Sequence, residues 1–238
     1  MTASADLCMN EDESDDDSLR ENTAAMGQSL GELFTILSEE LLFAHWRWQE
    51  YVDLGNTESR LDLMNASAPF FFWVVQRTLF FDTLLGITKL TAPPTSGRRG
   101  QENLTVRQLP ALLKPSLKDR VSARCEQIAQ KAKFAKTWRD KLIAHHDLKL
   151  ALRKAKPLPA ADRVQIDAVL GDLANILNEV REAYSLSTYH YPRVQSTGGA
   201  HELLFYVRDG LRCDERRTEM LERGEYDPTW WHADLPDI

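Results

Sequence analysis

The chain has 238 residues, of which 43% are hydrophobic and 27% are charged, and its formal net charge is −7 at pH 7. This composition supports one sizeable hydrophobic core, and the length fits one to two domains. The three cysteines are scattered and form no CxxC pair, which argues against a disulfide framework. The N-terminus lacks the pattern of a signal peptide. We therefore expect a cytoplasmic protein.

The charges are distributed unevenly along the chain. Residues 1–24 contain eight acidic residues and one arginine, so this segment alone carries −7, and residues 25–238 are neutral overall. Because the segment is polar and shows no periodicity, we expect residues 1–24 to be a disordered acidic tail. Residues 107–156, in contrast, contain fourteen Lys and Arg against four acidic residues. Such a stretch indicates either a polyanionic partner or ordinary solvated helix faces.

Apolar residues at helical spacing predict a first helix over residues 25–53 and a second over residues 59–91, bent near Pro69 because proline removes a backbone donor. The second helix contains the most apolar stretch of the chain, residues 70–90. Arg77 and Asp82 lie within it, and each charge would cost about 2.5–3.5 kcal/mol in lipid. We therefore expect a buried core helix and no membrane partner.

Helical patterns continue to the end of the chain. We expect a loop over 92–103, a short helix from Thr105, and further helices over 117–132, 134–154, 160–187 and 200–223. No segment alternates with a period of two for long enough to predict a sheet. The prediction is an all-α bundle of five to seven helices over residues 25–224, followed by a C-terminal tail at 225–238.

The segment 138–147 (WRDKLIAHHD) concentrates residue types that can cleave RNA without a metal. Arg139 is a fixed cation whose forked donors match a phosphate, and His145 has the side chain that titrates near neutrality. A histidine can take the proton from a ribose 2′-hydroxyl while an arginine stabilises the charge that develops on the phosphate. An arginine and a histidine at this spacing also occur by chance, in which case His145 is a core or interface residue.

Helical geometry leaves the identity of the histidine open. On a straight helix, Arg139 and His145 lie about 120° apart, whereas Arg139 and His146 nearly coincide. A site shared by two chains across a two-fold axis removes this restriction. Adjacent histidines point in different directions and no HExxH spacing is present, so we expect no metal site at His145, His146 and Asp147. The sequence contains no glycine-rich phosphate loop, so we expect no cofactor.

The string RDKLIAHHD, residues 139–147, resembles the Arg-polar-(x)n-His signature of the HEPN superfamily, and more narrowly its AbiU-type abortive-infection branch. The helices around the motif support this resemblance, which covers about residues 28–213. It implies that Arg139 and His145 are catalytic and that Asp140 is the polar residue that orients the site. Accessory candidates lie beside them in the sequence: Lys136, Lys141, His146 and Asp147.

The resemblance implies an endoribonuclease of an anti-phage or toxin type that needs no metal and cuts RNA as a homodimer. It also implies an antitoxin or another regulator as a further partner. The alternative is a non-catalytic helical module that binds RNA or a protein and keeps the motif as structure. A third hypothesis is a toxin modified by a nucleotidyltransferase, but such proteins usually have a tyrosine two residues after the histidine, where this chain has Asp147.

Overall fold

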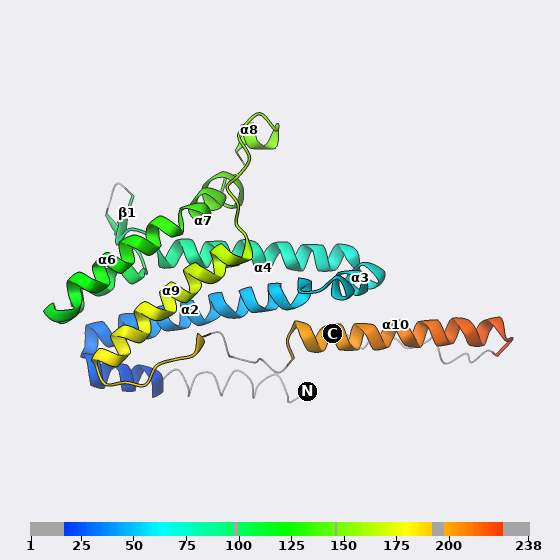
Figure 1. Cartoon of the computed structure of the whole chain (residues 1–238), viewed down its shortest axis with the longest axis horizontal. Coiled ribbons are helices and arrows are strands. Elements are labelled where there is room, and N and C mark those ends of the chain that lie inside the picture. The colour runs from blue at the N-terminus through cyan, green and yellow to red at the C-terminus, as the bar shows by residue number, and fades with distance from the viewer. Residues whose placement is uncertain (1–16, 98–99, 146, 192–197, 226–238) are drawn as a thin grey trace. The chain divides into compact units, whose positions relative to one another are not determined.

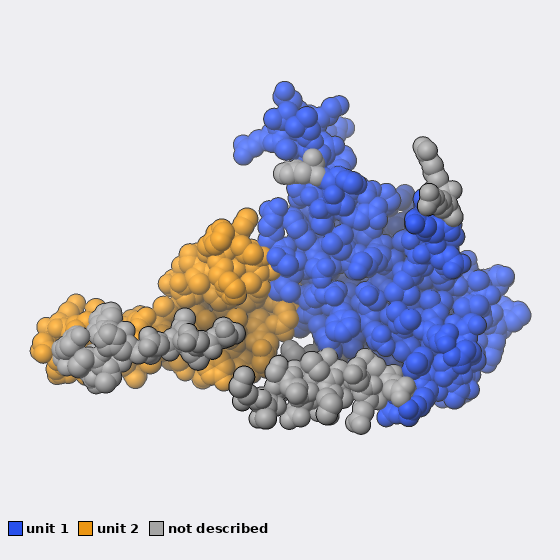
Figure 2. Space-filling view, turned by 180° about the vertical axis from the view of Figure 1, so that it is seen from behind, with its two compact units in different colours: residues 1–49, 77–194 blue, residues 50–76, 195–238 orange. Residues whose placement is uncertain are grey.

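The computed structural model describes residues 17–97, 100–145, 147–191 and 198–225, and these residues are mostly helical (Figure 1). The all-α prediction is therefore confirmed. The chain divides into two compact units (Figure 2). Unit 1 consists of residues 1–49 and 77–194, and unit 2 consists of residues 50–76 and 195–238. Two of the boundaries between the units, at residues 49/50 and 76/77, fall within the long helices α2 (Gln28–Gly55) and α4 (Pro69–Leu90).

The described residues contain more helices than the five to seven expected, because glycine, proline and an irregular turn divide the longer ones. Beside α2 and α4 they are residues 17–26, α3 (Glu58–Ser67), α5 (Leu109–Leu112), α6 (Pro115–Lys131), α7 (Lys133–Trp138), α8 (Leu148–Ala151), α9 (Arg163–Ala183) and α10 (Ala200–Glu222). Val106–Gln108 is a 3-10 turn and Arg139–Ile143 a π-helical turn. The loop after α4 holds a small antiparallel hairpin of β1 (Thr95–Ser96) and β2 (Gln101–Glu102), in which Thr95 pairs with Glu102.

The core of unit 1 includes the contact between α6 and α9, which lie side by side (Figure 1). The helix α9 begins with a capping box, in which Asp162 and Gln165 satisfy each other's backbone N–H groups. Its apolar stripe is buried along its whole length, from Ile166 to Val180. Each buried Leu, Ile or Val contributes about 1.5–3 kcal/mol, so this stripe explains why the helix predicted over residues 160–187 is present.

The N-terminal helix corrects the predicted boundary of the acidic tail. Residues 17–26 are helical, so the folded chain begins before residue 25, while residues 1–16 lie outside the described residues. Gly27 has a φ of +84° and ends this helix. Gly31 allows the helix to approach α2, because a Cβ at this position would lie 2.5 Å from the Thr23 Cα.

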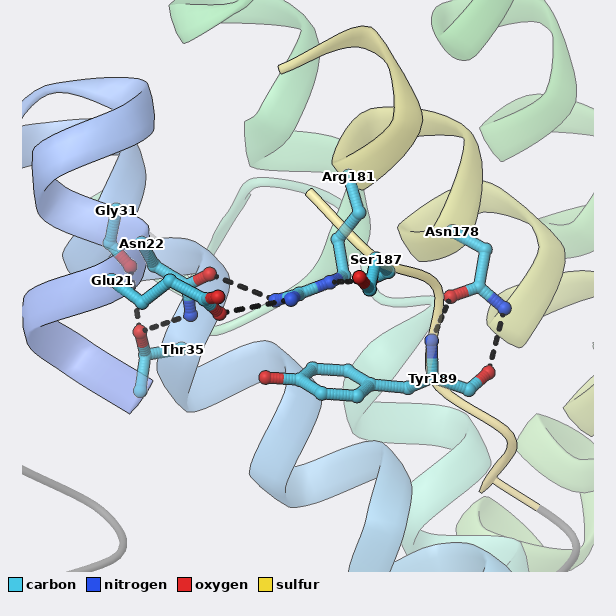
Figure 3. A network of polar contacts seen from close by, with 8 residues as sticks. All are labelled: Glu21, Asn22, Gly31, Thr35, Asn178, Arg181, Ser187 and Tyr189. Carbon is cyan, nitrogen blue, oxygen red and sulfur yellow. Dashed lines mark hydrogen bonds and ion pairs between the residues drawn. The ribbon is translucent and has the colours of Figure 1, made fainter. Parts of the chain in front are cut away.

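A buried arginine explains why this acidic segment folds (Figure 3). Arg181 on α9 is only 1% exposed, and its guanidinium donates to Asn22 Oδ1 at 3.0 Å and to Glu21 Oε2 at 2.9 Å. It also donates to the Ser187 carbonyl and lies 3.9 Å from the centre of the Tyr189 ring. A buried cation needs such partners, and composition alone does not reveal a partner that lies so far away in the sequence.

The helix α4 is buried only in part. Ala68, directly before Pro69, has a non-helical backbone, so the predicted bend is a break between α3 and α4. From Thr83 onward most residues of α4 are buried, but Phe70, Phe71 and Trp73 are 75%, 56% and 55% exposed. The prediction of a core helix is therefore right only for its second half. By length and composition alone α4 could cross a membrane, and 28% of its most apolar window is buried.

In unit 2, α3 packs against α10 and buries Met64 and Leu204. Arg60 on α3 donates to the Asp53 carbonyl and lies 2.9 Å from His201 Nδ1. The bounds of α10 agree with the predicted helix over residues 200–223. Except for residue 225, the predicted C-terminal tail lies outside the described residues.

Candidate active site

Trp138, at the end of α7, fixes the position of the Arg139 motif in unit 1. Its ring makes an edge contact with Phe80 on α4, with centroids 5.4 Å apart, and its indole Nε1 donates to the Pro159 carbonyl at 2.9 Å. Phe134 and Ala135 on the same helix are buried. These contacts anchor the end of α7, directly before Arg139.

The motif itself is not a straight α-helix, which corrects the prediction of one helix over residues 134–154. From Arg139 to Ile143 the chain forms a π-helical turn, and the Ala144 N–H donates to the Arg139 carbonyl at 2.8 Å. Asp147 then leaves the helical region and caps α8, where its side chain accepts from the Leu150 N–H at 3.0 Å. Aspartate favours this capping position, and π turns are frequent at functional sites.

Asp140 connects two cations. Its Oδ1 accepts from Arg139 Nε at 2.7 Å, and its Oδ2 accepts from Lys136 Nζ at 2.6 Å. Burial raises the pKa of Asp140, but the hydrogen bonds from Lys136 and Arg139 outweigh this effect, so the pKa lies below its usual value. The carboxylate is therefore charged at neutral pH, and it is in contact with the Arg139 guanidinium.

Arg139 also lines a cavity of about 380 Å³ in unit 1. The cavity is formed by the end of α4, the β1–β2 hairpin with the residues after it, the middle of α2 and the π turn. Its lining side chains are both polar and apolar: Glu40, Thr88, Lys89, Leu90, Ala92, Glu102, Asn103, Leu104 and Arg139. Cavities of about 300–1,000 Å³ are typical of sites for small ligands.

The structure places the two proposed catalytic residues differently. His145 is exposed, and none of the hydrogen bonds or ion pairs between the described residues involves it. It does not line the cavity beside Arg139. Its exposure excludes the alternative of a core histidine. His146 lies outside the described residues, so the choice between the two histidines stays a prediction.

The described accessory candidates differ in their surroundings. Lys136 binds Asp140, Asp147 caps α8, and the side chain of Lys141 is exposed. No group of three or more His, Cys, Asp and Glu side chains within the described ranges could hold a metal ion.

Ion pairs neutralise a large part of the basic stretch at residues 107–156. On α6, Arg120 and Arg124 both bind Glu179 of α9, and Lys131 binds Asp172 at 2.5 Å. Other cations of the stretch occur in none of the ion pairs between described residues. Four of them are exposed on or just after α8, and we call them the α8 basic group: Lys149, Arg153, Lys154 and Lys156.

Sequence analysis did not identify Glu40, Lys89 and Glu102, although they line the cavity beside Arg139. They lie on three segments that are far apart in the chain, and none belongs to a motif. The available signal is weak: Glu40 is a charged residue directly before the buried Leu41 on α2.

A family model from the HEPN group, described as AbiU2, matches residues 27–203. No curated protein and no solved structure matches the chain. The matched range covers well over half of the chain and includes the π turn, Asp140 and His145.

Proposed function

This chain belongs to the AbiU2 family of HEPN domains, and from this premise we propose that it is an endoribonuclease of the abortive-infection or toxin type that needs no metal. We propose that it cuts RNA with Arg139 and His145, and that the active form is a homodimer. We further propose that it acts in the cytoplasm, with an antitoxin or another regulator as a partner.

The observation that carries the proposal is the position of Arg139. It starts an irregular turn, Asp140 holds it on one side, and a cavity opens beside it. Asp140 contacts Nε and Nη2 of the guanidinium, at 2.7 and 2.5 Å. No other described residue accepts from the guanidinium, so Nη1 and one N–H of Nη2 can donate to a phosphate oxygen.

In the proposed reaction, His145 takes the proton from the ribose 2′-hydroxyl, and the 2′-oxygen attacks the adjacent phosphorus. A new bond forms between phosphorus and the 2′-oxygen while the bond to the 5′-oxygen breaks. The 5′-oxygen takes up a proton from water and leaves as a hydroxyl, and His145 returns the proton it removed to the solvent. The products are a 2′,3′-cyclic phosphate and a 5′-hydroxyl end. Arg139 stabilises the negative charge on the phosphate oxygens in the transition state.

The proposed homodimer gives a way for Arg139 and His145 to act at one site. His145 is exposed and lies outside the cavity that Arg139 lines. In a symmetric dimer, the arginine of one chain can meet the histidine of the other. Exposed aromatic side chains on α4 and α10, such as Trp73 and Tyr206, are of the kind that is enriched at interfaces between chains.

The test is incubation of the purified chain with total cellular RNA in EDTA, beside Arg139→Ala, His145→Ala and His146→Ala. We expect cleavage that leaves 2′,3′-cyclic phosphate ends, is lost in the first two variants and persists in the third. Loss only in His146→Ala would transfer the role of the base to that residue. If the folded wild-type chain binds RNA but does not cut it, the proposal is wrong and the chain is a binding module.

A further inference from the structure

The cavity beside Arg139 contains two carboxylates that the proposed cleavage does not use. Glu40 on α2 is half-buried, and Glu102 on β2 is exposed. Neither side chain takes part in the hydrogen bonds and ion pairs between the described residues, so the cavity has free acceptors as well as two cations, Lys89 and Arg139. A ligand that fits it carries both N–H donors and negative charge.

A nucleotide has this combination, and the four bases differ in how they match a carboxylate. A carboxylate accepts hydrogen bonds at two adjacent oxygens and donates none. Guanine presents two adjacent donors, N1–H and the N2 amino group, on one edge. Adenine and cytosine present an acceptor nitrogen next to their amino group on that edge, and uracil has one N–H between two carbonyls. Only guanine matches both carboxylate oxygens.

We propose that this cavity binds the guanine base on the 5′ side of the scissile phosphate, with the Glu40 carboxylate accepting from N1–H and N2–H. Leu90 and Leu104 also line the cavity and supply apolar contacts to the base, and Arg139 binds the phosphate. Glu40 carries the specificity because it is half-buried on a 28-residue helix, where fewer waters compete than at exposed Glu102. The inference rests on the proposed function and specifies its substrate.

Binding of mononucleotides to the full chain tests the inference without cleavage. Calorimetry with the 3′-monophosphates of guanosine, adenosine, cytidine and uridine should show the tightest binding for guanosine. Glu40→Gln presents one donor and one acceptor, and it should weaken binding of the guanosine nucleotide about 5- to 150-fold, the effect of one bidentate contact. The other three nucleotides should bind about as before. Arg139→Ala should weaken all four to a similar extent, because it removes a phosphate contact.

Two variants serve as controls. Glu32→Gln changes an exposed residue of the same helix that does not line the cavity, and should leave all four affinities unchanged. Glu40→Asp keeps the carboxylate and should retain a guanine preference, although a weaker one. Far-ultraviolet circular dichroism verifies that each variant is folded. Equal affinities for the four nucleotides in the wild type, or an unchanged preference in folded Glu40→Gln, would overturn the inference.

The cleavage products separate this inference from the proposed function. We expect cuts after guanosine in the wild type and a broader base distribution in Glu40→Gln. Cleavage without base preference in either protein would support the nuclease and refute the guanine site. Guanine-selective binding without any cleavage would support the cavity assignment and refute the nuclease.

Discussion

Arg181 gives the sharpest test of how the N-terminal helix is held. The substitution Arg181→Ala removes the only donor that the structure gives to Asn22 Oδ1 among the described residues, and Asn22 is itself 1% exposed. It also removes the hydrogen bond to the Ser187 carbonyl and the contact with the Tyr189 ring. Glu21 is half-exposed, so water can replace the arginine at its carboxylate.

The expected loss follows from these partners. Asn22 Oδ1 stays buried without a donor, which costs about 1–3 kcal/mol, and the ring contact adds about 1 kcal/mol. Ser187 is exposed and Glu21 is half-exposed, so water can replace the arginine at both, and the screened pair with Glu21 adds little. Together these losses predict a decrease of about 2–4 kcal/mol in the free energy of unfolding.

Urea unfolding followed by circular dichroism measures this decrease, as a lower midpoint at an unchanged slope. Glu21→Gln should cost no more than about 1 kcal/mol. Arg223→Ala, which removes an exposed arginine directly after α10, should stay within about 0.5 kcal/mol of the wild type. If Arg181→Ala also unfolds within 1 kcal/mol of the wild type, roughly the cost of one exposed contact, the reasoning on the buried cation is wrong.

Three further predictions concern pH, catalysis and RNA binding. Burial, opposed by the Leu170 backbone and by Asp167, lowers the pKa of His45 from 6.5 to about 4. The unfolded chain therefore binds one more proton between these pH values, so the free energy of unfolding should fall by up to about 3 kcal/mol as the pH decreases from 6.5 to 4. In His45→Phe this part of the pH dependence should be lost when unfolding is measured across the same pH range. An identical pH dependence in this variant would contradict the prediction. Asp140→Asn should lower the rate of RNA cleavage about tenfold to a hundredfold with unchanged helical content, because Arg139 loses a charged hydrogen-bond partner. A wild-type rate in this variant would exclude an orienting role for Asp140. Replacing the four residues of the α8 basic group by glutamine should weaken binding of single-stranded RNA. The slope of the logarithm of the binding constant against the logarithm of the salt concentration should become shallower by about 0.7 for each lost phosphate contact. An unchanged slope would place the RNA elsewhere.

The sequence predicted those elements whose determinants are local. The stripe of α9 follows from the spacing of apolar residues and is present in the structure, and the interruption at Pro69 was placed correctly, although it is a break and not the predicted bend. The start of the folded chain was predicted too late, because the helix at residues 17–26 depends on Arg181, which is distant in the sequence. A highly acidic composition gives no sign of such a partner.

The candidate site was predictable only as a motif. The family signature points to Arg139, Asp140 and His145 as candidates, and in the structure the first two are in contact. The π turn was not predictable, because the periodicity of apolar residues does not distinguish it from an α-helix. The cavity was not predictable either, since Glu40 and Glu102 come together with Arg139 only in the folded chain.

Mixing two inactive variants tests the central claim most directly. If Arg139 of one chain acts with His145 of the other, a heterodimer of Arg139→Ala and His145→Ala chains has one intact site. An equal mixture, unfolded and refolded together, should then recover about a quarter of the wild-type cleavage rate, because about half of the dimers are mixed and each has one of two sites. Each variant refolded alone should stay inactive. A mixture that forms heterodimers without any recovery would contradict a site shared between two chains.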